Sequence, residues 1–312
     1  YVEPLLGAVE VKNVTYSWLS ISSGFAMLCF MSVLSVASVL SIGSAGSFMS
    51  VFSIGSIASI NSLGCVAKIN MNCQTSTGCS YTKHKPARSE AEPDDIYVVF
   101  GQSNSGCNGK SSTPLLNSSS TLMAFCEGES YVYTEPMACG DSKGCNKSCW
   151  HAHFAEALHT SESNRTRTMF ALAGSPGASI AELEEFSNLD SILTQIKQRY
   201  GFVTAVLFIH GETDSGLGTR AETYSVVFNR IKARADNILT TDWYIALVSD
   251  ACGNHNPNVR NAQKTLKGTF RGPDIDQLNN SYRYDGCHFN DIGLQNVGIM
   301  FAGAVKSNTP ND

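Results

Sequence analysis

The stretch "DDIYVVFGQSNSGCNG" (residues 94–109) decides the fold of this chain. Its branched and aromatic residues at 96–100 predict a buried β-strand, which ends at Gly101 and is followed by a serine. Further strands are predicted at 168–174, at the start of 204–214, and at 242–250.

Segments with helical spacing alternate with these strands. They lie at 178–201, 220–238, 258–270 and 290–307. In the second of them we expect an apolar stripe made of Val226, Val227, Ile231 and Ile238. Alternation of this kind predicts an α/β fold, a three-layer α/β/α sandwich with a parallel sheet.

The carboxyl ends of the predicted strands are the expected place for a ligand. The loops after Phe100, Leu172 and Ile209 all fall at that edge of the sheet. We therefore expect these three loops to meet and to form the functional site.

The amino-terminal region has a different character. Residues 14–67 carry no charged side chain, and a serine recurs at every third position from Ser32 to Ser62. A helix turns 100° per residue and a strand alternates with period two, so neither keeps such a repeat on one face. An assembly stalk, a membrane span and a low-complexity segment all fit this stretch, and the three-residue period favours the stalk.

These patterns divide the chain into three parts. Residues 1–67 are the apolar triplet-repeat segment, residues 68–92 a cysteine-containing linker, and residues 93–312 the enzyme-like domain. Because one chain cannot bury the apolar edge of the repeat, we expect self-assembly through residues 14–67.

Composition restricts the partners and the compartment. The net charge is −5, and the absence of a basic cluster argues against nucleic-acid binding. Eleven cysteines together with several glycosylation sequons favour an extracellular or cell-surface protein with disulfides and N-linked glycans. No cysteine or histidine set has zinc-finger spacing. The sequons begin at Asn13, Asn117, Asn146, Asn164 and Asn279.

Three residues have the types that acyl transfer requires. Ser103 follows the first strand at a turn, where its hydroxyl can act as a nucleophile or can cap a helix. Near the carboxyl terminus, Asp285 and His288 are three positions apart, so one loop can present a base and the carboxylate that orients it. We expect His288 Nε2 within about 2.6–3.2 Å of Ser103 Oγ, with Asp285 at the other ring nitrogen.

The stretches "VVFGQSN" (98–104), "LFIHGETD" (207–214) and "DGCHFNDIG" (285–293) together resemble the SGNH-hydrolase superfamily. The branch they are most similar to is that of the carbohydrate esterases of the sialate O-acetylesterase and acetylxylan esterase type. The resemblance covers roughly residues 94–306. It includes "AGSPGASIAEL" (173–183), similar to a glycine block, and an Arg-x-x-Gln helix at Arg260 and Gln263.

The resemblance implies roles for particular residues. Ser103 would be the nucleophile, His288 the base and Asp285 its partner. The oxyanion would be held by the N–H groups of Ser103 and of Gly177 or Gly174. The remaining expected site residues, which line the pocket or support it, are Gln102, Asn104, His210, Glu212 and Asp214.

One departure from the family pattern stands out. His210 occupies the position of a glutamine that donates to the oxyanion in the family, and a neutral imidazole can still donate one N–H. The resemblance implies neither a metal nor another cofactor. Cys107 and Cys287 flank the site in sequence, and we expect them in structural disulfides.

Two functions follow from these observations. The first is a secreted or surface serine esterase that removes O-acetyl groups from carbohydrate and is tethered by its repeat. The alternative is a structural subunit of an extracellular filament, whose esterase-like domain binds sugar or has no catalytic role. A membrane-anchored ectodomain is a third interpretation.

Overall fold

The computed structural model describes residues 8–11, 14–17, 87–111, 121–135, 137, 147–159, 166–249, 252–253 and 255–311. The chain forms two compact units, Tyr1–Ser80 and Tyr81–Asp312. In the first unit, strands β1 (Ala8–Val11) and β2 (Val14–Ser17) form an antiparallel hairpin. The predicted triplet repeat beyond Ser17, its role in self-assembly and the linker before residue 87 lie outside the described residues.

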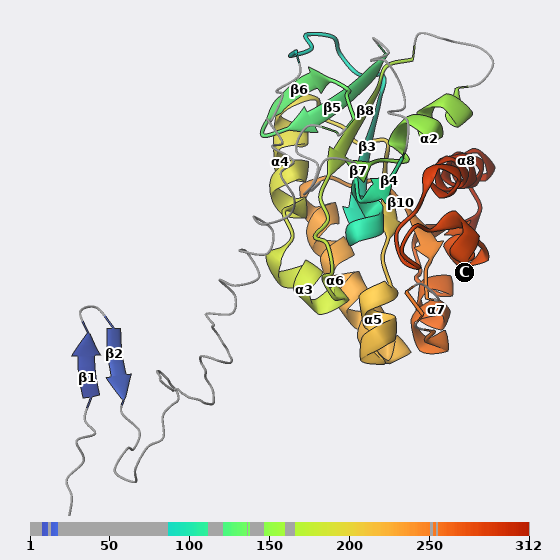
Figure 1. The fold of residues 1–312 in the computed structure, drawn as a ribbon. Helices are drawn as coiled ribbons and strands as arrows, with labels where there is room; N and C mark the ends of the chain where they lie inside the picture. The colour runs from blue at the N-terminus through green and yellow to red at the C-terminus, as the bar shows by residue number, and fades with distance from the viewer. Residues whose placement is uncertain are drawn as a thin grey trace, which may run out of the picture. The chain divides into compact units, whose positions relative to one another are not determined.

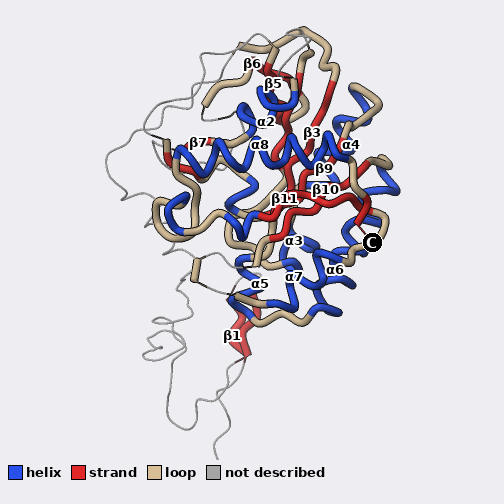
Figure 2. The backbone as a smooth tube through the Cα atoms, turned by 90° about the vertical axis from the view of Figure 1, so that its right-hand side faces the viewer, coloured by secondary structure: helices blue, strands red, loops and turns tan. Residues whose placement is uncertain are grey.

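The second unit is built on an eight-stranded sheet, whose strands cross the middle of the domain in Figure 2. Its spatial order is β12-β11-β10-β9-β3-β8-β5-β6. The strand bounds are β3 Asp95–Gly101, β5 Leu122–Cys126, β6 Glu129–Val132, β8 Thr168–Leu172, β9 Ala205–Ile209, β10 Asp242–Leu247, β11 Thr269–Asp274 and β12 Pro310–Asn311.

The six inner strands run parallel, whereas β6 and β12 are antiparallel at the two edges. The prediction of a parallel sheet is therefore confirmed for the interior and is wrong for both edge strands. A second small sheet pairs β4 (Gly109–Lys110) with β7 (Lys147–Ser148).

Helices cover both faces of the large sheet (Figure 1). One apolar cluster joins alternate strand residues such as Val98 and Phe208 to α3, α4, α6 and α7, and the other joins Tyr97 and Leu207 to α2 and α8. Because side chains alternate along a strand, neighbouring residues serve opposite cores. The helix bounds are α2 His151–Leu158, α3 Ile180–Phe186, α4 Leu189–Arg199, α5 Glu212–Leu217, α6 Ala221–Ile238, α7 Pro257–Lys264 and α8 Asp291–Ser307.

Local capping explains where several helices begin. Ser179 and Glu182 form a reciprocal capping box at the start of α3, and Asn290 caps α8 by accepting from the Gly293 N–H. In α7, Asn256 is the cap and Pro257 is the first helical residue.

Three predictions about helices need correction. The helix predicted at 178–201 is two helices, because the chain is extended at Ser187 after α3. The helix predicted at 258–270 ends at Lys264, and its tail leads into β11. In α6, Val226 is exposed, and the buried stripe includes Tyr224 and Phe228 instead.

Strand β3 lies between β8 and β9. The loops after these three strands therefore share one edge of the sheet, as the sequence predicts. Among the helices of the described residues, none is long and apolar enough to cross a membrane.

Candidate active site

The first element of the site is the turn after β3. Gly101 has φ +147°, and a Cβ atom there would lie 2.0 Å from the Ile209 carbonyl oxygen, so only glycine allows β3 to approach β9 this closely. A short 3-10 helix then begins at Ser103. The Ser105 hydroxyl donates to the Gln102 carbonyl at 2.6 Å and tightens the turn. Ser103 is 8% exposed, so its surroundings restrict access to the hydroxyl.

The second element is the loop before α8, which carries Asp285 and His288. Asp285 Oδ1 accepts from the backbone N–H of Cys287 at 2.9 Å and of His288 at 2.7 Å. Asp285 Oδ2 lies 2.8 Å from His288 Nδ1. Because an ionised carboxylate can only accept, the ring proton sits on Nδ1.

The charge state of Asp285 follows from its contacts. Partial burial raises the pKa of this carboxyl, but hydrogen bonds from the His288 ring and from two backbone N–H groups outweigh it. The net result is a pKa below the usual value. Asp285 is therefore an ionised acceptor at neutral pH.

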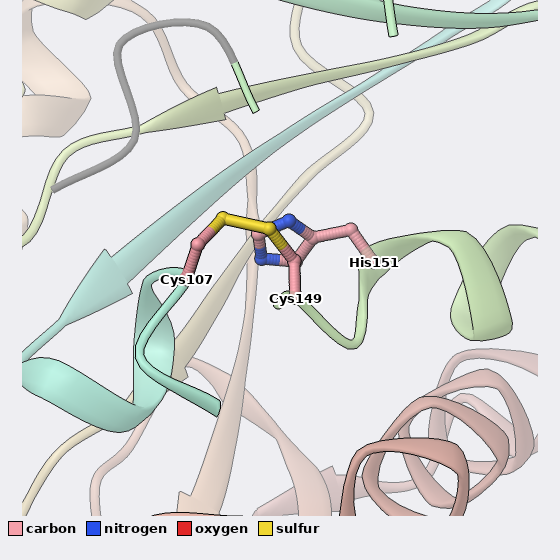
Figure 3. Close-up of side chains that lie close together, drawn as sticks. All are labelled: Cys107, Cys149 and His151. Carbon is pink, nitrogen blue, oxygen red and sulfur yellow. A yellow bond between two sulfur atoms is a disulfide. The ribbon is translucent and has the colours of Figure 1, made fainter. Parts of the chain in front are cut away.

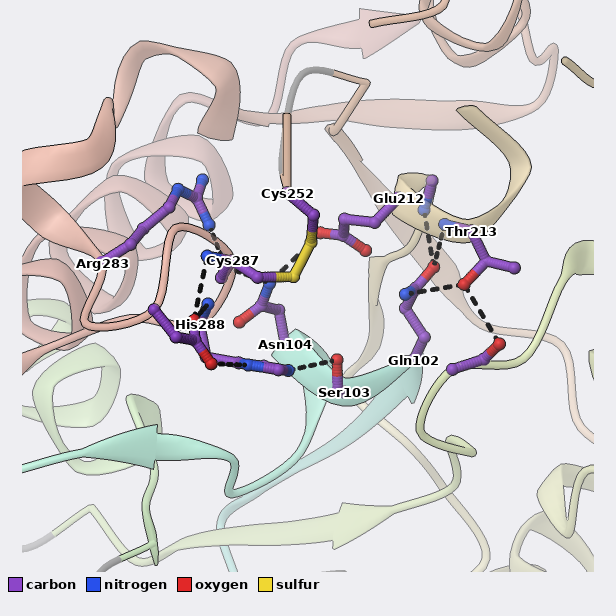
Figure 4. Close-up of a disulfide and its surroundings, with 12 residues drawn as sticks. Gln102, Ser103, Asn104, Glu212, Thr213, Cys252, Arg283, Cys287 and His288 are labelled. Carbon is purple, nitrogen blue, oxygen red and sulfur yellow. Dashed lines mark hydrogen bonds and ion pairs between the residues drawn. A yellow bond between two sulfur atoms is a disulfide. The ribbon is translucent and has the colours of Figure 1, made fainter. Parts of the chain in front are cut away.

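The two elements meet at Ser103. His288 Nε2 lies 2.9 Å from Ser103 Oγ, although the residues are 185 positions apart (Figure 4). With its proton on Nδ1, the imidazole has a free lone pair on Nε2 that faces the hydroxyl. The structure thus brings Ser103, His288 and Asp285 into one hydrogen-bonded chain.

Among the described residues, two disulfides hold the loops that carry Ser103 and His288. Cys252–Cys287 joins the loop after β10 to the residue just before His288. Cys107–Cys149 joins the end of the turn after β3, which carries Ser103 (the Ser103 turn), to the start of α2. The expectation that Cys107 and Cys287 form disulfides is confirmed. Their partners were not predicted, because sequence alone does not give disulfide connectivity.

The Cys287 carbonyl receives two further contacts. The Arg283 guanidinium donates to it, and so does the Asn104 side-chain amide at 3.2 Å. Asn104 Nδ2 also donates to Glu212 Oε2 at 3.2 Å. Asn104 and Glu212 are both buried. Asn104 therefore links the Ser103 turn to the His288 loop, and Glu212 holds Asn104 from the side of α5.

Gln102 connects the Ser103 turn to the loop that leads into α5. Its Oε1 accepts from the N–H groups of Gly211 and Thr213, each at 3.3 Å, and its Nε2 donates to Thr213 Oγ1 at 3.2 Å. Thr213 Oγ1 in turn donates to the Gly177 carbonyl at 3.1 Å. Gly177 is exposed and has φ +75°. Thr213 lies within the "HGETD" motif, but no pattern in the sequence indicates a role for it.

The structure does not bring His210 to Ser103. This imidazole is fully buried, with Nε2 3.1 Å from the Ala178 carbonyl and Nδ1 2.9 Å from the Tyr224 hydroxyl. Burial lowers its pKa, and the nearby carboxylates of Asp214 and Glu212 offset only part of that effect. His210 is thus a neutral residue engaged at both nitrogens, and its contacts do not support an oxyanion role.

Cys107, Cys149 and His151 have potential metal-ligand atoms within 4.8 Å of one another (Figure 3). The two sulfurs are joined in a disulfide, so they lack the thiolates that bind a transition metal. Burial lowers the pKa of His151 to about 4, and its Nε2 lies 3.3 Å from the Ser105 carbonyl. The Cys107–Cys149 disulfide and the His151 ring therefore hold the Ser103 turn in place.

Of the predicted glycosylation sites, the structure describes Asn279. Its side chain is exposed and accepts from the N–H and hydroxyl of Ser281, both at 2.8 Å. The other four positions, Asn13, Asn117, Asn146 and Asn164, lie outside the described residues.

Comparison with known families and structures agrees with this architecture. Residues 93–307 match the model of a family described as "Carbohydrate esterase, sialic acid-specific acetylesterase". No curated protein sequence matches the chain.

Among solved structures, an Arabidopsis thaliana protein is 21% identical, with a TM-score of 0.59 over 70% of this chain and 99% of its own. This likeness supports the fold. A carbohydrate acetylesterase from Xanthomonas citri is 16% identical (TM-score 0.44, 69% of this chain and 56% of its own). NanS is 12% identical (TM-score 0.48, 70% and 98%).

Proposed function

Because the chain belongs to the sialic acid-specific acetylesterase family of carbohydrate esterases, we propose that it removes O-acetyl groups from carbohydrate, with Ser103 as its nucleophile. Membership of this family makes the chain an esterase-like hydrolase. Which residues react and which substrate is cleaved are what we propose. The observation that carries it is the hydrogen-bonded chain from Ser103 through His288 to Asp285.

The proposed first half of the reaction forms an acetyl-enzyme. His288 Nε2 takes the Ser103 proton as Oγ attacks the acetyl carbonyl carbon, and Asp285 stabilises the resulting imidazolium. The carbonyl oxygen becomes an oxyanion, for which the N–H groups of Ser103 and Gly177 are the proposed donors. The tetrahedral intermediate then collapses, and the sugar oxygen leaves with the proton from His288.

The second half regenerates the serine. A water molecule gives a proton to His288 and attacks the acetyl carbon, and acetate leaves as Ser103 Oγ takes that proton back. Every proton in this scheme passes through one imidazole nitrogen, which the 2.9 Å contact makes feasible.

The structure offers support for both proposed oxyanion donors. Neither N–H has a hydrogen-bond acceptor among the described residues. Such donors are free to bind a developing negative charge. The space beside the Gly177 Cα is also open, since a Cβ atom there would meet nothing within 4 Å.

We further propose an extracellular or cell-surface location. Disulfides persist in oxidising compartments, and Cys107–Cys149 and Cys252–Cys287 both lie beside the site. Asn279 is exposed, as a glycan acceptor must be.

The test is hydrolysis of p-nitrophenyl acetate and of an O-acetylated sugar by the wild-type chain and by Ser103→Ala. We expect acetate release from both substrates, and a loss of at least about 10⁴-fold in kcat for the variant. Folded wild-type protein that hydrolyses neither substrate would favour a non-catalytic subunit. Hydrolysis that persists in Ser103→Ala would assign the reaction to another group.

A further inference from the structure

Thr213 is the second residue of α5 and holds the Gln102 side chain at two points. Its backbone N–H donates to Gln102 Oε1 at 3.3 Å, and its hydroxyl accepts from Gln102 Nε2 at 3.2 Å. Gln102 directly precedes Ser103, so this pair of contacts links Thr213 to the Ser103 turn (Figure 4).

The same hydroxyl also reaches the loop after β8. It donates to the Gly177 carbonyl at 3.1 Å. A carbonyl can only accept and an amide NH₂ can only donate, so the direction of both bonds is fixed. The result is a directed relay from Gln102 Nε2 through Thr213 Oγ1 to Gly177 O.

Other contacts hold the loop on either side of Gly177, but among the described residues none of them reaches the Gly177 carbonyl. His210 Nε2 lies 3.1 Å from the Ala178 carbonyl. Ser175 N–H donates to the Gly101 carbonyl at 2.9 Å, and Ala178 N–H donates to the Ser175 carbonyl at 3.2 Å. Gly177 itself is exposed, and its φ of +75° belongs to a region that glycine enters and leaves readily. Within the described residues, the Thr213 hydroxyl is the partner that fixes the Gly177 carbonyl.

We propose that Thr213 is a positioning residue for the oxyanion loop, because its hydroxyl sets the orientation of the Gly177 peptide relative to Ser103. This inference rests on the proposed function, in which Gly177 N–H is an oxyanion donor. Thr213 itself touches neither the nucleophile nor the base in the structure. It acts through Gly177 and Gln102.

The matched variants are Thr213→Val, which keeps the shape and removes the hydroxyl, and Thr213→Ser, which keeps the hydroxyl. Thr204→Val is the control. Thr204 is also half-buried and bridges two groups, since it accepts from Ile96 N–H at 3.0 Å and donates to Asp95 Oδ1 at 3.2 Å. It lies at the amino end of the strands, away from the site.

For p-nitrophenyl acetate, we expect Thr213→Val to lower kcat by about 10–100-fold with KM changed by less than about threefold, because a misplaced oxyanion donor affects mainly the transition state. A boronic acid that forms a tetrahedral adduct with Ser103 should lose affinity by the same factor as kcat/KM. Thr213→Ser and Thr204→Val should stay within about threefold of wild type in kcat.

Hydrogen exchange of the peptide covering residues 173–180 supplies a readout that does not need catalysis. Exchange in this peptide should be faster in Thr213→Val and unchanged in Thr204→Val. Unchanged kcat and exchange in Thr213→Val would overturn the inference, as would a Thr213→Ser variant as impaired as Thr213→Val. If wild-type protein shows no Ser103-dependent hydrolysis but the exchange result holds, the proposed function fails and the positioning role stands.

Discussion

Two imidazoles in this domain, His288 and His210, lie near the same kinds of partner. Each is close to an aspartate and to a hydroxyl. His288 contacts Asp285 at 2.8 Å and Ser103 at 2.9 Å. His210 lies 3.5 Å from Asp214 Oδ2 and 2.9 Å from the Tyr224 hydroxyl.

Burial and the group that accepts the ring proton separate the two sites. His210 is fully buried, and its Nε2 faces the Ala178 carbonyl, which fixes the proton on that nitrogen. In both rings the nitrogen that faces the hydroxyl carries the lone pair, but the protonated nitrogen of His288 donates to a carboxylate, which can stabilise an imidazolium, whereas that of His210 donates to a neutral carbonyl. A set of residue types is therefore not enough for acyl chemistry, which also needs an accessible nitrogen in the accepting state.

The largest expected effect comes from comparing the same substitution at both positions. His288→Gln removes the base and should lower kcat by at least about 10⁴-fold with little change in stability. His210→Gln keeps an N–H for the Ala178 carbonyl, so kcat should stay within about threefold of wild type. Its free energy of unfolding should fall by about 1–3 kcal/mol, because ring packing is lost in the core.

Kinetics with p-nitrophenyl acetate and urea denaturation of both variants measure these effects. The distinction between the two imidazoles breaks down if His210→Gln is folded and as inactive as His288→Gln. In that case the buried ring takes part in the reaction.

The sequence predicts four of the six inner strands, β3, β8, β9 and β10, because the local apolar pattern and the burial that the sheet requires agree there, whereas β5 was not predicted. The run at 96–100 is branched and aromatic, and β3 is buried throughout its length after Asp95. β11 was not predicted, because its first residues were assigned to a helix over 258–270 and because glycine and proline, at 272 and 273, are unfavourable within strands. It forms because it pairs with β10, and a Cβ atom at 272 would lie 2.6 Å from the Ile245 carbonyl carbon.

For the site, the motifs predicted which residue types are present but not how their side chains are oriented. Ser103, Asp285 and His288 were found because their spacing and order are distinctive. The orientation of His210 depends on Tyr224, fourteen positions away on α6, and no local pattern encodes that contact. Likewise, no local pattern predicts that Cys252 pairs with Cys287, because this pairing depends on how the loop after β10 meets the loop before α8.

The disulfide beside His288 is a covalent restraint that His210 lacks among the described residues. The Cys252→Ala/Cys287→Ala variant opens a bridge that spans 35 positions, which should lower the free energy of unfolding by about 3–4 kcal/mol. The loop of His288 should also lose its order, so the low-field NMR signal of the proton shared with Asp285 should broaden or vanish.

The control is Cys107→Ala/Cys149→Ala, whose bridge spans 42 positions but does not adjoin His288. It should lose a similar free energy and keep the low-field signal. If the signal survives in the first variant as well, hydrogen bonds alone hold the His288 loop.

A third prediction concerns acid stability and uses His151, which is fully buried like His210. Burial lowers the pKa of His151 from 6.5 to about 4, so between these values the unfolded chain binds a proton that the folded chain does not. Stability should be fully present above pH 6.5 and fall as the pH drops toward 4, by up to roughly 3 kcal/mol from this group.

Urea denaturation at pH 7.5, 6.5, 5.5 and 4.5 checks this slope. In His151→Gln the decrease between pH 6.5 and 4.5 should be shallower than in wild type, whatever the effect on stability at pH 7.5. Equal slopes in the two proteins would mean that His151 is solvated or protonated in the folded state.

The smallest expected effect tests the hydroxyl that faces His210. Tyr224→Phe keeps the ring but leaves His210 Nδ1 as a buried acceptor without its 2.9 Å donor, which should cost about 1–2 kcal/mol of folding free energy. Tyr200→Phe is the matched control, because among the described residues the Tyr200 hydroxyl is buried without a hydrogen-bond partner. Its removal should be neutral or stabilising.

Neither tyrosine variant should change kcat by more than about twofold, in contrast to any change that removes the hydroxyl facing His288. A Tyr224→Phe variant with normal stability would show that water or another group replaces the lost donor. A Tyr224→Phe variant with normal stability and reduced kcat would instead tie the Tyr224 hydroxyl to the chemistry, through the Ala178 carbonyl that His210 holds next to Gly177.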